Sequence, residues 1–240
     1  MFTFLSIQET TAQIQVSVQG QITDRYNAAI TNLGSSSIDV RLGGIYALQR
    51  IMQDSPRDQP SVVAVLCAFV RDHASNVVGT PGSIPAHPRT DIQAALTVVG
   101  SRDAAHDGTS TVIDLSSTAL VGASFARLNF STADFSDADL ENANFFLANI
   151  QATIFIGARL VDADISGVNG DGALVGDADL TGAVAGGASF PSAAFTRSDL
   201  TNADFSGADL RGANLSEANL TNTDFAGADL SGVIRNERGP

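Results

Sequence analysis

The sequence contains one cysteine, no lysine and no tryptophan, and these absences narrow the classes of protein it can belong to. A single cysteine, Cys67, cannot form an intramolecular disulfide, which favours a reducing, cytoplasmic setting. The sequence has no basic segment followed by an apolar one at its start and no long uncharged apolar run. Neither a signal peptide nor a membrane span is therefore predicted.

The acidic and basic residues are unevenly distributed. All thirteen basic residues are arginine, against twenty-six acidic residues. Residues 1–112 contain nine acidic residues and seven arginines, whereas residues 113–240 contain seventeen and six. An acidic surface repels phosphate groups, so direct binding to nucleic acid is not expected. A partner that is attracted by charge should be a basic protein.

Motifs that carry catalysis are scarce. The histidines His73, His87 and His106 have no metal-ligand spacing. Cys67 lies in the apolar run VVAVLCAFV, which is typical of a core residue. The stretch DADISGVNGDGA at 162–173 begins like a calcium loop, but its twelfth position is alanine where a glutamate is needed. No metal, no cofactor and no enzymatic activity are predicted.

A repeat of five residues dominates the second half of the sequence. Residues 201–232 read TNADFSGADLRGANLSEANLTNTDFAGADLSG, in which A-(D/N)-(L/F)-(S/T/R)-(G/N) recurs without an insertion. From about residue 113 onward, residues whose number is divisible by five are mostly Leu, Phe or Ile, and the residue two before is mostly alanine. The phase is kept over roughly 120 residues, so no loop is inserted.

Neither a helix nor a flat strand can bury this pattern. Five residues rotate an α-helix by about 500°, and an odd period in a strand sends successive residues to opposite faces. The large residues stay on one side only if the chain turns inward once per pentad. Coils of that kind stack as a solenoid, with the Asp or Asn pointing outward and Gly, Asn or Ser at the turns.

These pentads resemble the pentapeptide-repeat proteins. The resemblance implies a mainly β fold: a right-handed quadrilateral β-helix of about six coils, preceded by an α-helical N-terminal region. At roughly 4.8 Å per stacked strand, the rod would be about 29 Å long. The expected division is an α-helical region at 1–105, the β-helix at 111–234 and a tail at 235–240.

One coil breaks the pattern of large inward residues. Around 168–187, Gly170 and Ala185 stand where neighbouring coils have Phe, Ile or Leu. Missing volume in a packed core is destabilising. We therefore expect this coil to be soft or locally distorted.

The first hundred residues have helical patterns. Residues 8–33 are expected to form a helix that ends at Gly34. SSSIDVRLGGIYALQRIMQDSP has helical apolar spacing with an N-cap at Ser36, and PSVVAVLCAFVRDHA repeats the spacing. In RTDIQAALTVVG, Thr90 and Gln93 are expected to form a capping box.

This region also resembles a segment that precedes the repeats in some bacterial pentapeptide-repeat proteins, through QITDRY, DVRLGGIYALQRI and DSPRDQPSVVAVLCAFVRDHA. In that group two membrane helices often come first. They are absent from this sequence, so tethering to a membrane is expected only if the native chain is longer.

The outward acidic residues are the first candidate for an interaction surface. At twenty residues per coil they form two columns: Asp164, Asp204 and Asp224, and Asp139, Asp179 and Asp199. Certain pentapeptide-repeat proteins bind DNA gyrase and topoisomerase IV by imitating B-form DNA, which carries about 17 charges over 29 Å. Residues 114–232 have a net charge of −12 spread over four walls, and Arg159 interrupts one column, so the imitation would be partial.

The gyrase-binding relatives are typically dimers joined through apolar C-terminal segments. Here the sequence SGVIRNERGP offers only Val233 and Ile234 for such a contact. The sequence therefore allows a dimer of this kind but does not establish one.

Apolar residues at outward positions are the second candidate surface. They are Phe146, Ile154, Ile156, Val161 and Leu174. Ile154 and Leu174 are twenty residues apart, so we expect them to be stacked neighbours and part of a docking site. The alternative is that the N-terminal helices pack on this wall.

Two hypotheses for function follow. The first is a non-catalytic rigid scaffold for protein–protein interaction. The second is a DNA-mimicking modulator of DNA gyrase or topoisomerase IV that confers quinolone resistance or self-resistance.

Overall fold

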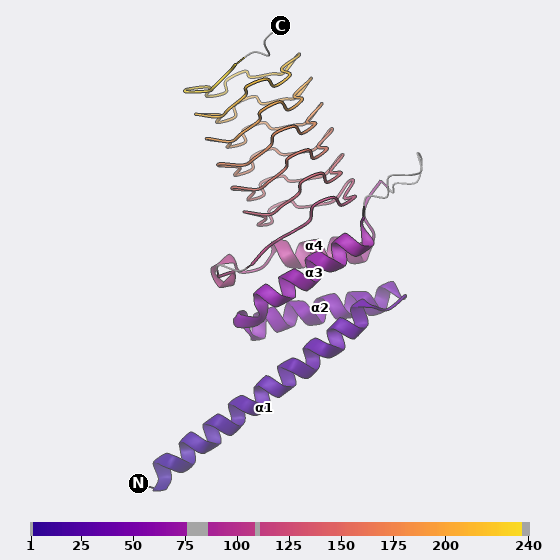
Figure 1. Ribbon diagram of the computed structural model, residues 1–240, viewed down its shortest axis with the longest axis vertical. Helices are drawn as coiled ribbons and strands as arrows, with labels where there is room; N and C mark the ends of the chain where they lie inside the picture. The colour runs from indigo at the N-terminus through magenta and orange to yellow at the C-terminus, as the bar shows by residue number, and fades with distance from the viewer. Residues whose placement is uncertain (1, 76–85, 109–110, 237–240) are drawn as a thin grey trace.

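The computed structural model describes residues 2–75, 86–108 and 111–236, and it consists of a helical part beneath a stack of coils (Figure 1). The helices follow one another in the order α1 (Phe2–Leu33), α2 (Ile38–Asp54), η1 (Pro56–Asp58), α3 (Gln59–His73), α4 (Thr90–Gly100) and η2 (Ala104–His106), where η1 and η2 are single 3₁₀ turns. Among the described residues, no helix is both long and apolar enough to cross a membrane.

The coils are held together by parallel bridges between residues twenty positions apart. Asp134 bridges Asp114 on one side and Ile154 on the other, and the same offset continues to the pair Asn214 and Ile234. The bridges join residues twenty apart and recur every five residues, so each coil has four sides, as the resemblance to the pentapeptide-repeat proteins implies. Each bridge involves a single residue, and no longer strand forms in the described part of the chain.

Each pentad turns at a residue with left-handed backbone geometry. Thr132, Asn202 and Glu217 have φ values of 60°, 59° and 60°, and glycines occupy the same place in other pentads, such as Gly207 with φ 64°. Non-glycine residues rarely adopt this region, so the stacking forces the backbone into it. The Gly, Asn and Ser at the pentad junctions therefore have the role that the sequence predicts.

Large inward side chains fill the solenoid in two aromatic groups. Phe125 and Phe145 stack with ring centroids 4.3 Å apart, and Phe135 and Phe155 stack at 5.3 Å. Nearer the C-terminus, Phe195 meets Phe205 edge to face. Aromatic pairs of both geometries contribute stabilisation beyond the area they bury.

The coil around Gly170 is not distorted, so that half of the expectation is wrong, while a lower local stability stays a prediction. The bridges run through this coil without interruption, from Asn149 through Asn169 to Ser189. The volume that Gly170 lacks is filled by the ring of Phe190, which a Cβ at position 170 would approach to 2.3 Å. A large residue in the next coil thus compensates for the small one.

The helix boundaries differ from the sequence-based ones at three points. Helix α1 begins at Phe2, before residue 8, and the N-cap of α2 is Ser37 in place of Ser36. The capping box in α4 is wrong, because the N-cap is Arg89 and no side chain caps it. Gln93 instead turns its amide toward the first coil, where it accepts from Ser124 N–H at 2.9 Å and donates to Ser124 C=O at 2.7 Å.

The helical part closes the N-terminal end of the solenoid. In later coils the N–H of each bridging residue donates to a carbonyl 21 residues earlier, as Asp139 does to Thr118 at 2.8 Å. In the first coil, helix ends supply these carbonyls: Ala119 N–H donates to Ala74 and Asn129 N–H to Gly100, at 2.6 and 2.8 Å. Carbonyls left unpaired at helix C-termini thus satisfy donors left unpaired at a sheet edge.

Buried ion pairs hold the helices in this position. Arg102 is buried and binds both carboxylate oxygens of Asp107, while its Nη1 donates to the carbonyl of Asn129 at 2.7 Å. Arg41 donates to the fully buried Asp91 at 2.6 Å. Asp91 also binds Arg89 at 3.0 Å, so it is loss of a carboxylate, Asp91 or Asp107, that would leave a buried guanidinium without its ionic partner.

In the described part of the chain, the last coil is uncovered on its C-terminal face. Leu220, Phe225 and Leu230 are only half-buried, whereas the inward residues of inner coils, such as Leu200, are fully buried. Among the described residues, nothing lies on this face of the last coil.

Replacing Gly170 with alanine should destabilise the solenoid by about 1–3 kcal/mol, because the added methyl group overlaps the ring of Phe190. The matched control is Gly186→Ala, where the nearest atom would be 3.8 Å away. The free energy of unfolding in urea, followed by circular dichroism, compares the two. Equal effects would contradict the packing of Phe190 on Gly170.

Candidate protein-interaction surfaces

The bridges sort the outward residues into four columns, one on each side of the solenoid. We name each column by one member. The Leu174 column is Asp114, Asp134, Ile154, Leu174, Ala194, Asn214 and Ile234; the Asp204 column is Ser124, Asn144, Asp164, Val184, Asp204 and Asp224. The Asp139 column is Ala119, Asp139, Arg159, Asp179, Asp199 and Asn219; the Asn149 column is Asn129, Asn149, Asn169, Ser189, Asp209 and Asp229.

All six candidate aspartates have a structural role in the turns. One carboxylate oxygen of each accepts the N–H of the residue two positions later, at 2.8 to 3.2 Å: Asp139, Asp164, Asp179, Asp199, Asp204 and Asp224. Asn214 and Asn219 make the same bond. The preference for Asp or Asn in the repeat is therefore explained by the turn, and only the second oxygen of each aspartate is free to act on a partner.

Asp199 is the most strongly hydrogen-bonded of the six. Its Oδ1 accepts from the hydroxyl of Thr201 at 2.5 Å, from the Thr201 N–H at 2.9 Å and from Asn219 Nδ2 at 3.1 Å. These bonds, the Thr201 hydroxyl first, hold the pKa of Asp199 below its ordinary value despite some desolvation. The bond to Ser206 lowers the pKa of Asp204 in the same way.

Arg159 neutralises part of the Asp139 column. Its guanidinium lies between Asp139, at 3.3 Å, and Glu141. The hydrogen bond to Glu141 raises the pKa of Arg159, so the three side chains form a fixed charged group. Because Arg159 divides this column and Val184 divides the Asp204 column, neither has an acidic residue in every coil.

Three of the predicted apolar residues lie together. Ile154 and Leu174 are bridged neighbours, and Ile156 follows at the adjoining corner. Leu174 is 40% exposed and Ile156 is similarly exposed. With Ala194 in the next coil they form what we call the apolar strip (Ile154, Ile156, Leu174 and Ala194). The helices cap the end of the solenoid (Figure 1), so the alternative that they cover this wall is wrong.

Phe146 lies on the opposite side of the solenoid. It follows Asn144, whose column is two sides away from that of Ile154. The guanidinium of Arg127 lies over its ring, 5.6 Å from the centroid, and this cation–π contact accounts for an aromatic residue at an exposed corner. Val161 is half-buried at another corner and does not join the apolar strip.

Within the repeats, the exposed apolar residues Leu147 and Val184 were also missed in the sequence. Leu147 covers Gly167 in the neighbouring coil, and Val184 is 42% exposed in the Asp204 column. Both occupy outward phases of the pentad, so the repeat register would have identified them.

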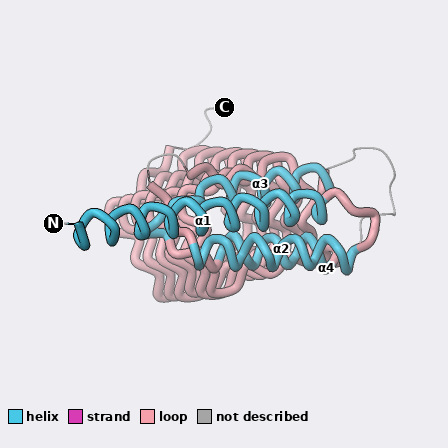
Figure 2. Tube along the Cα trace, turned by 90° about the horizontal axis from the view of Figure 1, so that it is seen from below, coloured by secondary structure: helices cyan, strands magenta, loops and turns pink. Residues whose placement is uncertain are grey.

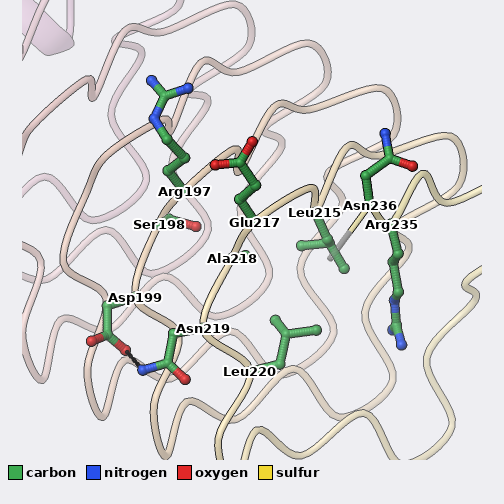
Figure 3. A pocket seen from close by; sticks show the side chains of 10 residues that line it. All are labelled: Arg197, Ser198, Asp199, Leu215, Glu217, Ala218, Asn219, Leu220, Arg235 and Asn236. Atoms are coloured by element: carbon green, nitrogen blue, oxygen red, sulfur yellow. Dashed lines mark hydrogen bonds between the residues drawn. The ribbon is translucent and has the colours of Figure 1, made fainter. Parts of the chain in front are cut away.

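A hollow of about 590 Å³ opens beside the last coils, and Figure 3 shows the side chains that line it. Its charged groups already have partners: Arg197 binds Asp177 at 2.5 and 2.7 Å, and Asp199 binds Asn219. The lining contains no histidine or cysteine. Nothing in it resembles a nucleophile with its base.

The described residues provide neither a metal-binding site nor a reactive thiol. They contain no group of three or more His, Cys, Asp or Glu side chains that could hold a metal ion. Cys67 is buried, and burial raises its pKa to about 12, a shift only partly offset by Arg71 and Arg102. A thiol with so high a pKa stays protonated and unreactive at neutral pH.

The family model for pentapeptide repeats matches residues 113–145, 176–212 and 198–234, in eight copies. No curated protein sequence matches the chain.

Solved structures of pentapeptide-repeat proteins are similar to about half of this chain. Rfr23 of the cyanobacterium Cyanothece 51142 is 25% identical, with 45% of this chain and 65% of that protein covered and a TM-score of 0.24. HetL of Nostoc sp. strain PCC 7120, described as involved in the regulation of heterocyst differentiation, is 22% identical, with 50% and 73% covered and a TM-score of 0.29.

A third similar structure is QnrB1, a plasmid-mediated fluoroquinolone resistance protein. It is 23% identical, with 51% of this chain and 76% of that protein covered and a TM-score of 0.23. The chain spans less than two thirds of the length of Rfr23. All three TM-scores lie below 0.5, so these structures do not bear on the function of this chain.

Removing the charge of Asp199 should change how the stability depends on pH. Its lowered pKa means that the ionised form stabilises the fold above the ordinary aspartate pKa, near 4, and that this contribution is lost as the pH falls below it. The difference in unfolding free energy between wild type and Asp199→Asn, measured in urea from pH 6 to pH 3, should therefore shrink as the pH falls.

Thr201→Val is the control for this effect, because it removes the first of the bonds that lower the pKa. The pH dependence of the Asp199→Asn difference should be weaker in a Thr201→Val background. A difference that is constant across the pH range would contradict the assignment.

Proposed function

We propose that this chain is a non-catalytic, rigid scaffold that binds a protein partner through the apolar strip. The pentapeptide repeats that the family model matches at 113–145 and 176–234 support the rigid framework. Its winding is proposed to be right-handed, as the resemblance to the family implies. The observation that carries the proposal is the exposure of Ile156 and Leu174 on a wall that no helix covers.

The apolar strip lacks the turn hydrogen bond in which an Asp or Asn side chain accepts the N–H of the residue two positions later. Ile154 and Leu174 stand where Asp or Asn would accept the N–H of the residue two positions later. Among the described residues, no protein acceptor replaces it for Ile156 N–H or Gly176 N–H. Residues that break a local rule without a structural gain are candidates for function.

The surroundings of the strip suit a protein partner. Ala152, Gly172 and Ser192 stand two positions before successive members of the column, so small corners border the strip on one side. Asp134 extends the column beyond Ile154 and adds negative charge at its edge. The surface thus fits a partner with an apolar centre and a basic rim.

The partner is expected to bind with side chains and not as an added strand. The backbone groups of the columns are already bonded along the solenoid axis, as in Ile154 N–H to Ala133 and Leu174 N–H to Thr153, both at 2.9 Å. A β-strand needs a free edge, and the walls have none. A helix or a loop can lie on the strip.

Replacing Leu174 with aspartate should weaken binding of the partner about tenfold or more, because it puts an unpaired charge in the centre of an apolar contact. Partners are first captured from a lysate on the wild-type protein, and the dissociation constants of the purified partners are then measured. Ile154→Asp should act in the same direction.

Val184→Asp is the matched control, since Val184 has almost the same exposure on the opposite side of the solenoid. It should change the affinity less than twofold. The proposal fails if Leu174→Asp leaves every captured partner bound, or if the two substitutions have equal effects.

A second candidate is imitation of DNA toward a type II topoisomerase, and the observation in its favour is the negative charge of the repeat domain. Residues 113–240 contain seventeen acidic residues and six arginines. The charge would act through the Asp204 and Asp139 columns, where one oxygen of each aspartate is free.

A gyrase supercoiling assay tests this candidate. A DNA mimic should inhibit supercoiling or protect gyrase from a quinolone at micromolar protein, and joint replacement of Asp164, Asp204 and Asp224 by asparagine should remove the effect while keeping the turns. The absence of both effects in the wild-type protein would exclude this function.

A further inference from the structure

We propose that the N-terminal half of α1 is a dimerisation arm that pairs with α1 of a second copy of this chain. The inference is independent of the proposed function, because it concerns a different surface and a different partner. Figures 1 and 2 show this half of α1 extending beyond the other helices.

The packed part of α1 ends well before its N-terminus. Helices α1 and α2 form an antiparallel pair, in which Ile22, Ala29 and Leu33 of α1 are buried. Helix α2 ends at Asp54, whose carboxylate accepts from Arg25 Nη1 at 2.8 Å. Since α1 has 32 residues and α2 has 17, at about 1.5 Å per residue, α1 extends roughly 20 Å or more beyond α2.

The apolar stripe of α1 continues into the projecting part. Val18 lies one helical turn before the buried Ile22, and Ile14 lies one turn before Val18, so the three share a face. Ile14 is 58% exposed and Val18 is 45% exposed. The face that packs on α2 therefore goes on past the end of α2 without a partner among the described residues.

The charge of the arm decides between possible occupants. Residues 2–23 contain one charged residue, Glu9, and no basic residue. A nucleic acid and an anionic membrane surface both attract helices through basic residues, which the arm lacks. A basic protein would find almost no acidic residue on it.

A second copy of the chain suits the arm in both its charge and its apolar face. The arm is nearly neutral, whereas the repeat half has an excess of eleven negative charges, so the arm is where two copies can approach with least repulsion. An identical apolar stripe is complementary to it in a two-fold symmetric contact. A projecting helix of fewer than twenty residues is also marginal without packing, and the pairing would provide it.

Pairing through α1 would place two repeat domains in one particle. Each would keep its apolar strip, so a partner with two binding segments would gain from the raised effective concentration. Dimerisation through the arm also leaves the open C-terminal coil unused.

Sedimentation equilibrium of the full chain at 5 to 200 μM tests the proposal. The wild-type protein should show twice the protomer mass, and Ile14→Glu/Val18→Glu should weaken self-association about a hundredfold or more, since two carboxylates would be buried in the apolar contact. The variant should keep the thermal unfolding of the wild-type protein, because both residues lie on the projecting part of α1, beyond its contact with α2.

Val16→Glu is the matched control, because Val16 lies about 200° around the helix from Ile14 and is 72% exposed. It adds the same kind of charge to the arm and should leave the dimer intact. Equal dissociation by Val16→Glu would show that charge alone, and not the Ile14/Val18 face, is responsible, and would overturn the proposal.

If the arm binds a lipid surface, or if the dimer forms elsewhere, the same experiments give different results. A wild-type protein that stays monomeric at 200 μM overturns the proposal, and one that also floats with phosphatidylcholine vesicles indicates a lipid surface instead. A dimer that survives Ile14→Glu/Val18→Glu but is lost in Leu230→Asp would place the contact at the open C-terminal coil, which likewise overturns it.

Discussion

The structure depends on one constraint: the backbone of each coil must be hydrogen-bonded to the coils twenty residues before and after it. The bridge from Asp134 to Ile154 repeats at this offset to the end of the solenoid. Inserting one residue would misalign every later bridge and turn inward positions outward. The constraint also explains why Thr132 and Glu217 accept a left-handed φ, because the turn must come at the same place in each pentad.

A stack of coils has two ends, and in the described residues only the N-terminal end is capped. At the N-terminal end the carbonyls of Ala74 and Gly100 and the amide of Gln93 take the place of a missing coil. The helical region is thus part of the hydrogen-bonded ladder. At the C-terminal end Phe225 and Leu230 are half-buried, and no described residue covers them. Native solenoids commonly need caps for this reason.

The same constraint limits where function can reside. The inward residues pack in the core. The Asp and Asn residues hydrogen-bond within the turns, as Asp199 and Asp204 illustrate. The positions left free are those where the repeat permits any residue or where its rule is broken. Ile154 and Leu174 break it on one wall, and the projecting part of α1 lies outside the repeat altogether. These are the surfaces from which partners are best inferred.

The period of five in the sequence determined the coil and its inward residues, and the resemblance to the pentapeptide-repeat proteins supplied the four sides and with them the stacking of Ile154 on Leu174. It could not determine what depends on contacts between distant segments. Phe190 fills the space at Gly170, Arg127 covers Phe146, and Gln93 binds the first coil in place of capping its own helix. The register places Phe190 beside Gly170, but which side chain fills, covers or binds its neighbour depends on three-dimensional packing, which a local pattern does not specify.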